Sequence, residues 1–166
     1  MSDTRSYGAF DITSGKIRIS DPTLPKDQRG HAGSLKKVAN GRWRAYGISD
    51  KGSIRKLIAI HDSQGLETIL RLGVWEPVYF TNGVDSGQTG IFDEDFYQGE
   101  VTSEDYGAAI DNGEVNAFNF ACVTHTKSNA LGGTLRQGAV SCFENGEYDV
   151  LYSKNFNDEI VGVIIN

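Results

Sequence analysis

Apolar and polar positions alternate with a period of two along most of this chain, the pattern typical of half-buried β-strands. The segments YGAFDIT (7–13) and KIRIS (16–20) alternate on either side of Ser14-Gly15. Because two residues of this type can close a tight turn, we expect these segments to form a hairpin. In the second segment Ile17 and Ile19 share the face that would be buried.

A second hairpin is predicted where Asn40-Gly41 separates SLKKVA (34–39) from RWRAYGI (42–48). Trp43 would lie on its buried face. The β-branched content of IRKLIAIHD (54–62) also favours a strand. In VWEPVYF (74–80) the proline cannot donate a ladder hydrogen bond, which predicts an edge strand or a bulge.

The last third of the chain contains four runs separated by turn residues, and TSEDYGAAI (102–110) before them is the best helix candidate. We expect the runs to form an antiparallel meander; they are VNAFNFACVTH (115–125), TLRQGAVSCF (134–143), EYDVLYS (147–153) and IVGVII (160–165). The whole pattern predicts a mainly β fold, an antiparallel sandwich or a strongly curved sheet with one or two short helices.

Length and composition indicate how many domains the protein has and in which cellular compartment it works. A chain of 166 residues, 39% of them apolar, is typical of a single globular domain, here 1–166. The N-terminus does not resemble a secretory signal, and no apolar segment reaches the ~20 residues that span a bilayer. With only Cys122 and Cys142 present, disulfide stapling is not expected, so we predict a soluble cytoplasmic protein without membrane contact.

Charge is distributed unevenly along the chain. Residues 1–56 hold 12 Lys and Arg against 5 Asp and Glu, whereas residues 57–166 hold 4 against 17. Two interpretations are open: the oppositely charged parts attract each other across the fold, or the basic part forms a patch for an anionic ligand. The overall pI near 5.0 argues against a DNA-binding protein.

The stretch GVDSGQTGIFDED (83–95) is the main candidate for a site, and no phosphate-binding loop, nucleophile elbow or zinc-protease motif accompanies it. Asp85 and Asp93 could act as general acid and base or bind a divalent cation. Alternatively, the Asp85 carboxylate accepts the N–H groups of Gly87 and Gln88 in a purely structural turn. We otherwise predict neither a metal site nor a cofactor.

The three histidines are further candidates, because histidine transfers protons near neutral pH. His61 and His125 each end a predicted strand and could pair in space with Asp85 or Asp93. His31 lies beside Arg29 in a loop rich in proline and glycine, where both side chains could contact a ligand.

Five segments, spread over most of the chain in a fixed order, resemble a family of small proteins from Firmicutes and their phages for which no activity is established. They are SGKIRISDP (14–22), NGRWRA (40–45), IRKLIAIH (54–61), GVDSGQTGIFD (83–93) and GAVSCFENGEYDVLY (138–152). The family pattern reads SGxLxVSDPCY, GxW, GVDSGQAGIFD and GDGSY. The resemblance implies a shared fold and an intracellular protein associated with phages or mobile elements. This chain departs from the pattern at Thr23-Leu24 and at residues 144–148.

Three hypotheses about function follow. The first is a non-enzymatic binding module for a small anionic ligand or a protein partner, with these ligand-binding residues: Asp21, Asp85, Ser86, Gln88, Asp93, Arg29 and His31. The second is a metal-assisted hydrolase that uses Asp85 and Asp93 with a histidine. The third is an interaction protein that binds through its acidic C-terminal sheet. The first two require sheet pairing to bring residue 21 and residues 85–93 to one polar pocket; ligand identity and oligomeric state stay open.

Overall fold

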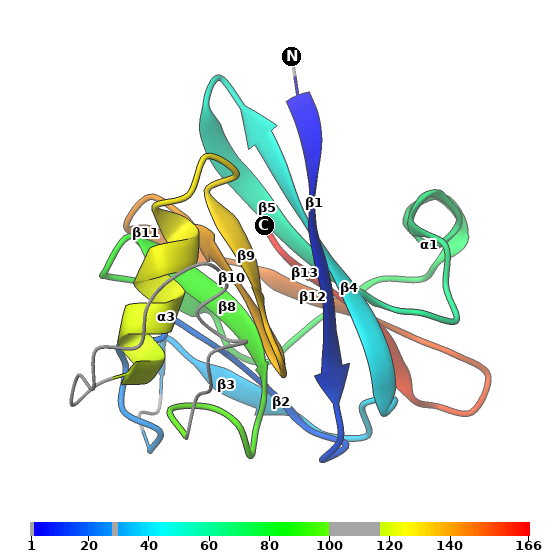
Figure 1. The fold of residues 1–166 in the computed structure, drawn as a ribbon. Helices are drawn as coiled ribbons and strands as arrows, with labels where there is room; N and C mark the ends of the chain where they lie inside the picture. The colour runs from blue at the N-terminus through cyan, green and yellow to red at the C-terminus, as the bar shows by residue number, and fades with distance from the viewer. Residues whose placement is uncertain (1, 28–29, 100–116) are drawn as a thin grey trace.

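The computed structural model describes residues 2–27, 30–99 and 117–166 (Figure 1). In this part of the chain strands account for 49% and helices for 11% of the residues, which confirms the predicted mainly β fold with few short helices. The sheets are antiparallel, and none of those formed by the described residues closes into a barrel.

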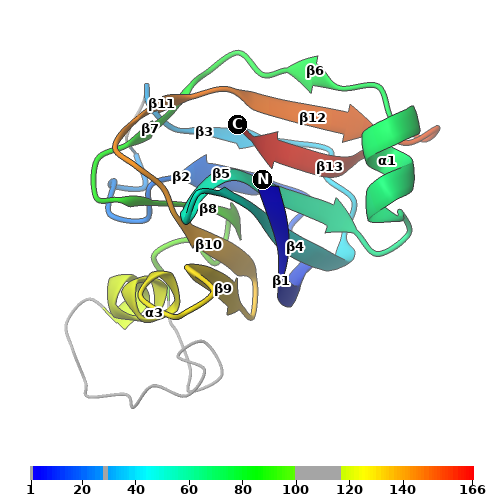
Figure 2. The ribbon, with the colours of Figure 1, turned by 90° about the horizontal axis from the view of Figure 1, so that it is seen from above.

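Two large sheets make up the structure (Figures 1 and 2). In spatial order the first contains β1 (Ser2–Ile12), β4 (Gly41–Asp50), β5 (Ser53–His61), β13 (Ile160–Ile165), β12 (Val150–Lys154) and β6 (Glu76–Pro77). The second contains β3 (Gly33–Leu35), β2 (Ile17–Ser20), β8 (Gln88–Asp93), β10 (Gly138–Cys142) and β9 (Gly132–Leu135). A separate pair joins β7 (Asn82–Val84) to β11 (Gly146–Tyr148).

The main core lies between the inner faces of the two sheets, as period-two alternation requires. Ile17 and Ile19 point inward from β2, and Trp43 points inward from β4 with none of its surface exposed. The indole Nε1 of Trp43 donates a 2.9 Å hydrogen bond to the Ala39 carbonyl, so the buried polar atom has a partner. The predicted inward faces of both strands are therefore confirmed.

Two helices cover outer faces of the sheets on opposite sides of the molecule (Figure 2). Helix α1 (Leu66–Leu72) buries Ile69 against the first sheet. Helix α3 (Ala117–Thr126) buries Phe118 and Cys122 against the second sheet, in an aromatic cluster with Phe92. Each sheet thus has apolar side chains on part of its outer face as well. None of the helices in the described residues is long and apolar enough to cross a membrane.

Both predicted hairpins are wrong. Strand β1 pairs with β4, whereas β2 pairs with β3 and β8, so Ser14-Gly15 carries the chain from one sheet to the other. Asn40-Gly41 does the same between β3 and β4. The strands on either side of each turn bury their apolar faces more completely in two facing sheets than in one two-stranded ribbon. Tertiary packing therefore overrides the local turn signal.

The predicted C-terminal meander is also wrong. The first run forms α3 rather than a strand, because Phe118, Ala121 and Cys122 together cover the second sheet at helical spacing. The second run folds into two strands, β9 and β10, that belong to the second sheet, while β12 and β13 belong to the first. The expected helix at 102–110 lies outside the described residues.

Two strand predictions in the middle of the chain are confirmed. Residues 54–62 form most of β5, as the β-branched content indicates. The segment around Pro77 contributes only the two-residue edge strand β6. Its place at the edge of the first sheet agrees with the restriction that proline imposes.

Candidate functional site

Asp21 is a buried carboxylate that joins two distant loops. Its Oδ2 accepts the backbone N–H groups of Asp85 and Ser86 at 2.9 and 2.8 Å, and its Oδ1 accepts the Ser86 hydroxyl at 2.7 Å. Thr23 donates to Oδ1 through both its backbone N–H (2.9 Å) and its hydroxyl (2.7 Å). Burial acts to raise the pKa of Asp21, but these hydrogen bonds outweigh burial and lower it. Asp21 is therefore ionised and acts as an acceptor that clamps the 85–86 turn.

Asp93 clamps a different place in the fold. Its Oδ2 accepts the backbone N–H groups of Thr13 and Ser14 at 2.7 and 3.1 Å, and its Oδ1 accepts that of Asp95 at 2.9 Å. Burial again acts to raise its pKa, and the hydrogen bonds lower it below the ordinary value. The carboxylate thus holds the corner where the chain passes from β1 to β2.

The acidic residues do not share one pocket. In the β2–β8 ladder Asp93 is opposite Ile17, whereas Gly90 is opposite Ser20, the neighbour of Asp21. The clamps of Asp21 and Asp93 are therefore at opposite ends of this pair, roughly 13 Å apart at the rise of a β-strand. Asp85 is exposed before β8 begins, at the end away from Asp93. No cluster of three metal-ligating side chains occurs among the described residues.

The local interpretation of the 83–95 stretch also needs correction. Gly87 donates its N–H to Oδ1 of Asn145 at 2.9 Å, not to Asp85. The carboxylate that organises this turn is Asp21, which lies 64 residues from Asp85 in the sequence. Gln88 is buried, and its Oε1 has no hydrogen-bond partner. Most of these candidate side chains hold the scaffold together.

Of the three histidines, His31 lies beside the turn that Asp21 clamps, because it lines a hollow of about 360 Å³ together with Asp85. The His61 ring is held by Ser63 Oγ at Nδ1 (2.8 Å) and by the Asn40 carbonyl at Nε2 (2.9 Å). His125 is in the last turn of α3, where its ring packs against Gly133. His31 has a left-handed backbone (φ 62°) and forms an ion pair with Glu147 on β11. Arg29 lies outside the described residues.

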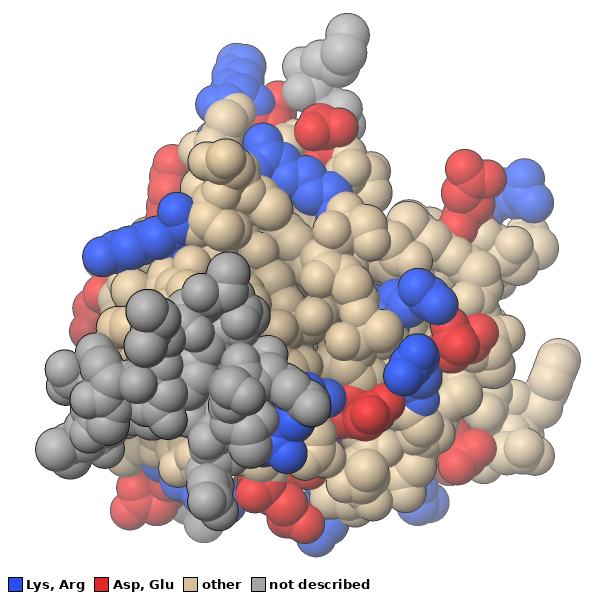
Figure 3. Space-filling view, in the orientation of Figure 1, with Lys and Arg blue, Asp and Glu red and all other residues tan. Residues whose placement is uncertain are grey.

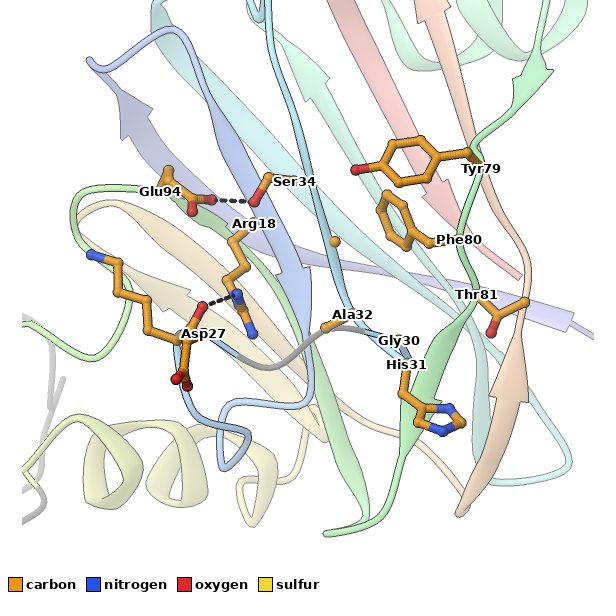
Figure 4. A pocket seen from close by; sticks show the side chains of 12 residues that line it. Arg18, Asp27, Gly30, His31, Ala32, Ser34, Tyr79, Phe80, Thr81 and Glu94 are labelled. Atoms are coloured by element: carbon orange, nitrogen blue, oxygen red, sulfur yellow. Dashed lines mark hydrogen bonds between the residues drawn. The ribbon is translucent and has the colours of Figure 1, made fainter.

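A groove of about 620 Å³ lies beside His31, where an edge of each large sheet faces the other (Figure 4). One flank carries Arg18, Ser34 and Glu94, and the other carries the rings of Tyr79 and Phe80, which project toward β3. The remaining lining residues are Lys26, Asp27, Gly30, His31, Ala32, Gly33 and Thr81.

Backbone hydrogen bonds join the two sides at both ends of the gap between β3 and the 78–81 segment, in which the groove lies. At one end the Gly83 N–H donates to the His31 carbonyl at 2.7 Å. At the other end Ile160 donates to the Lys37 carbonyl at 2.8 Å and accepts from Ala39 at 3.0 Å. Between these points β3 and the 78–81 segment stay apart, and the Phe80 ring packs on Gly33, where a Cβ would come within 2.4 Å of it. The groove is therefore a short slot.

Arg18 is a buried, charged side chain in the lining of this groove. It is 3% exposed, and its Nη1 and Nη2 donate to the carbonyls of Lys26 (2.6 Å) and Pro25 (3.0 Å). Its guanidinium also stacks on the Tyr97 ring, 4.6 Å from the centroid. No carboxylate of the described residues forms an ion pair with it, and its buried Nε has no hydrogen-bond partner.

Arg18 is not among the residues that the sequence predicts to form a site. Alternation places it on the face of the 16–20 segment opposite Ile17 and Ile19, which share the predicted buried face. In the structure this face is covered by the loop that follows β2, which Tyr97 and Gln98 hold through hydrogen bonds to the Leu24 carbonyl, both 2.7 Å long. Nothing in the local sequence pattern could have indicated that cover.

The uneven charge along the chain does not produce a uniformly basic face in the view of Figure 3, where Lys and Arg lie next to Asp and Glu. Several ion pairs join the basic N-terminal part to the acidic C-terminal part, among them Lys37–Asp158 (3.6 Å) and Arg55–Glu144 (3.9 Å). These contacts agree with the interpretation that the two parts attract each other across the fold.

Comparison with known proteins adds no function to this geometry. No protein-family model, curated protein or solved structure matches the chain. The resemblance to the family from Firmicutes and phages therefore stays a prediction. Of its three matching acidic residues, Asp21 and Asp93 are structural clamps in the fold, and Asp85 is exposed.

Proposed function

We propose that this protein is a non-enzymatic binding module that holds a small organic anion in the groove between β3 and the 78–81 segment. The buried guanidinium of Arg18 carries this proposal, because it is a positive charge at the groove wall that has no carboxylate partner among the described residues. A buried charge that lacks a counter-charge is costly, and an anion that enters the groove would offset part of that cost.

Two carboxylates also line the groove, and neither is paired with Arg18. Glu94 accepts the Ser34 hydroxyl at 2.7 Å, and Asp27 is exposed to solvent. Charges in water are screened more strongly than buried charges. The field of the buried guanidinium should therefore dominate inside the groove, and Lys26 adds a second positive charge at the rim.

The shape of the groove favours a small molecule over a protein segment. A peptide that adds a strand to a sheet edge needs an edge that is open along its length. Here the edge of β3 is closed at both ends by the hydrogen bonds of His31 and of Ile160. A volume of about 620 Å³ lies in the range of small-molecule sites, and Tyr79 and Phe80 offer apolar surface to a ring.

Binding is better supported than hydrolysis. A general base works best with a pKa near the working pH, whereas hydrogen bonds hold the pKa values of Asp21 and Asp93 below their ordinary value. His61 is bound to Ser63 and to the backbone rather than to either acid.

Calorimetric titration with phenyl phosphate, with inorganic phosphate as the ringless reference, tests the proposal. We expect phenyl phosphate to bind and Arg18→Gln to weaken it at least tenfold. The matched control Arg44→Gln, which removes an exposed arginine paired with Asp62 outside the groove, should leave binding unchanged. If Arg18→Gln fails to fold, Lys26→Gln against Lys51→Gln gives the same comparison at exposed positions. No binding, or equal losses in the groove variant and its control, would overturn the proposal.

A further inference from the structure

A second depression continues the groove on the far side of Tyr79. It has a volume of about 320 Å³ and lies between the residues that follow β3 and those that follow β6. Its lining residues are Leu35, Lys36, Lys37, Pro77, Val78, Tyr79, Tyr152, Lys154 and Ile160. Tyr79 lines both hollows, so a single elongated ligand could occupy both.

This second depression has an excess of positive charge. Lys37 and Lys154 share one carboxylate, that of Asp158, at 3.6 and 3.0 Å. Lys36 is exposed and forms no ion pair with the described residues. A second acid, Glu76, forms a hydrogen bond with the Tyr152 hydroxyl, and this bond raises the pKa of that tyrosine. Asp158 and, to a smaller extent, Glu76 raise the pKa of Lys154. Among the described residues, two carboxylates, those of Asp158 and Glu76, therefore face the three ammonium groups, which leaves an excess of positive charge.

Tyr79 stands between the two cationic regions with 84% of its surface exposed. Its ring meets the Phe80 ring edge to face, with the centroids 5.1 Å apart, and this contact supports it from below. An exposed aromatic ring beside positive charges is a common stacking surface for a planar group of an anionic ligand.

The fold also sets the spacing of the two regions. Arg18 is opposite Ser34 in the β2–β3 ladder, and Lys36 lies two residues beyond Ser34 on the same side of the chain. With the rise of a strand and the separation between neighbouring strands, the two regions are on the order of 10 Å apart.

We propose that the Lys36, Lys37 and Lys154 depression is a second anion subsite, and that the ligand is an elongated dianion. One acid group binds near Arg18, the other binds near Lys36, and a planar part between them rests on Tyr79. This inference rests on the proposed function, because it extends the same groove.

Two matched pairs of probes test the inference by calorimetry. Biphenyl-4,4′-dicarboxylate carries an acid at each end of a rigid two-ring rod, and biphenyl-4-carboxylate carries only one. Adenosine 3′,5′-bisphosphate and adenosine 5′-monophosphate make the same comparison with phosphates and so distinguish the two kinds of acid group. In at least one pair we expect the probe with two acid groups to bind ten times more tightly than the probe with one.

The variant Lys36→Gln should remove most of that tenfold advantage and leave the binding of the probes with one acid group unchanged, because Lys36 is exposed and remote from Arg18. Lys56→Gln, at an exposed lysine of β5 outside both hollows, is the control. Equal affinities within both pairs, or an equal effect of the two lysine variants, would overturn the second subsite. Binding of a probe with one acid group that depends on Arg18 would then still support the proposed function, whereas no binding of any probe would refute both.

Discussion

The contrast between Asp21 and Asp85 gives the sharpest test of the structure. Asp21 is fully buried and accepts five hydrogen bonds, whereas Asp85 is exposed, and no hydrogen bond to its carboxylate is seen in the described part of the chain. The substitution Asp21→Asn keeps the shape of the side chain and removes its charge. Asp85→Asn makes the same chemical change in solvent and is the matched control.

The expected loss of stability can be worked out from the contacts. The asparagine is best accommodated with its oxygen toward the N–H groups of Asp85 and Ser86 and its amide nitrogen toward Thr23. The Thr23 N–H then loses its acceptor, which costs about 1–3 kcal/mol. The Thr23 and Ser86 hydroxyls must rotate to accept from the amide, and the two bonds to the oxygen lose their charge assistance. We expect Asp21→Asn to lower the free energy of unfolding by about 3 kcal/mol in total. Asp85→Asn should change it by less than about 0.5 kcal/mol.

Urea denaturation at several pH values is the assay. The pKa of Asp21 is lowered in the folded state, so its contribution to stability is present above the unfolded value of about 3.9 and is lost as the pH falls through the folded value. The difference between wild type and Asp21→Asn should therefore be constant near neutrality and shrink below about pH 4. Equal effects of the two substitutions at pH 7, or a difference that persists undiminished in acid, would refute the clamp.

Two further predictions concern the second sheet. Asp93→Asn should lower the free energy of unfolding by about 2–3 kcal/mol in urea, because three backbone donors lose a charged acceptor; a loss below about 0.5 kcal/mol, as at an ordinary surface position, would contradict this. Gly90→Ala should cost about 1–3 kcal/mol, because the new Cβ would lie 2.6 Å from the Ala139 carbonyl oxygen and 2.4 Å from the Phe92 ring. A thermal melt with Gly65→Ala, where φ is −92° and the new Cβ would come no closer than 3.6 Å to Thr68, measures the cost of an alanine without crowding, and an equal loss there would argue against the packing explanation.

Part of the fold follows from local pattern. Alternation identifies the inward faces of β2 and β4, since adjacent side chains of a strand point to opposite sides. The place of Pro77 at a sheet edge follows from its missing N–H. Period two misleads over Ala117–Thr126, because Phe118, Ala121 and Cys122 have the i, i+3, i+4 spacing of one helix face, which packs on the second sheet.

The site residues show the limit of local reasoning more clearly. The sequence indicates that residue 21 and the 85–93 stretch matter, and the structure assigns Asp21 to one clamp and Asp93 to another. Arg18 was not predicted as a site residue, because alternation tells which face a side chain occupies but not what covers that face. Its burial, without an acid partner among the described residues, depends on a loop held by Tyr97 and Gln98, about 75 residues away in the sequence.

The sequence by itself determined that the chain forms strands, which side chains of several strands point inward, and that a proline-containing strand lies at an edge or a bulge. Only the tertiary structure decided which strands pair, which loop each buried carboxylate clamps, and which guanidinium is buried without an acid partner among the described residues. The physical reason is the distance along the sequence over which each effect acts. Side-chain alternation is set by neighbouring residues, whereas strand pairing and desolvation depend on which distant segments can bury the most apolar surface together.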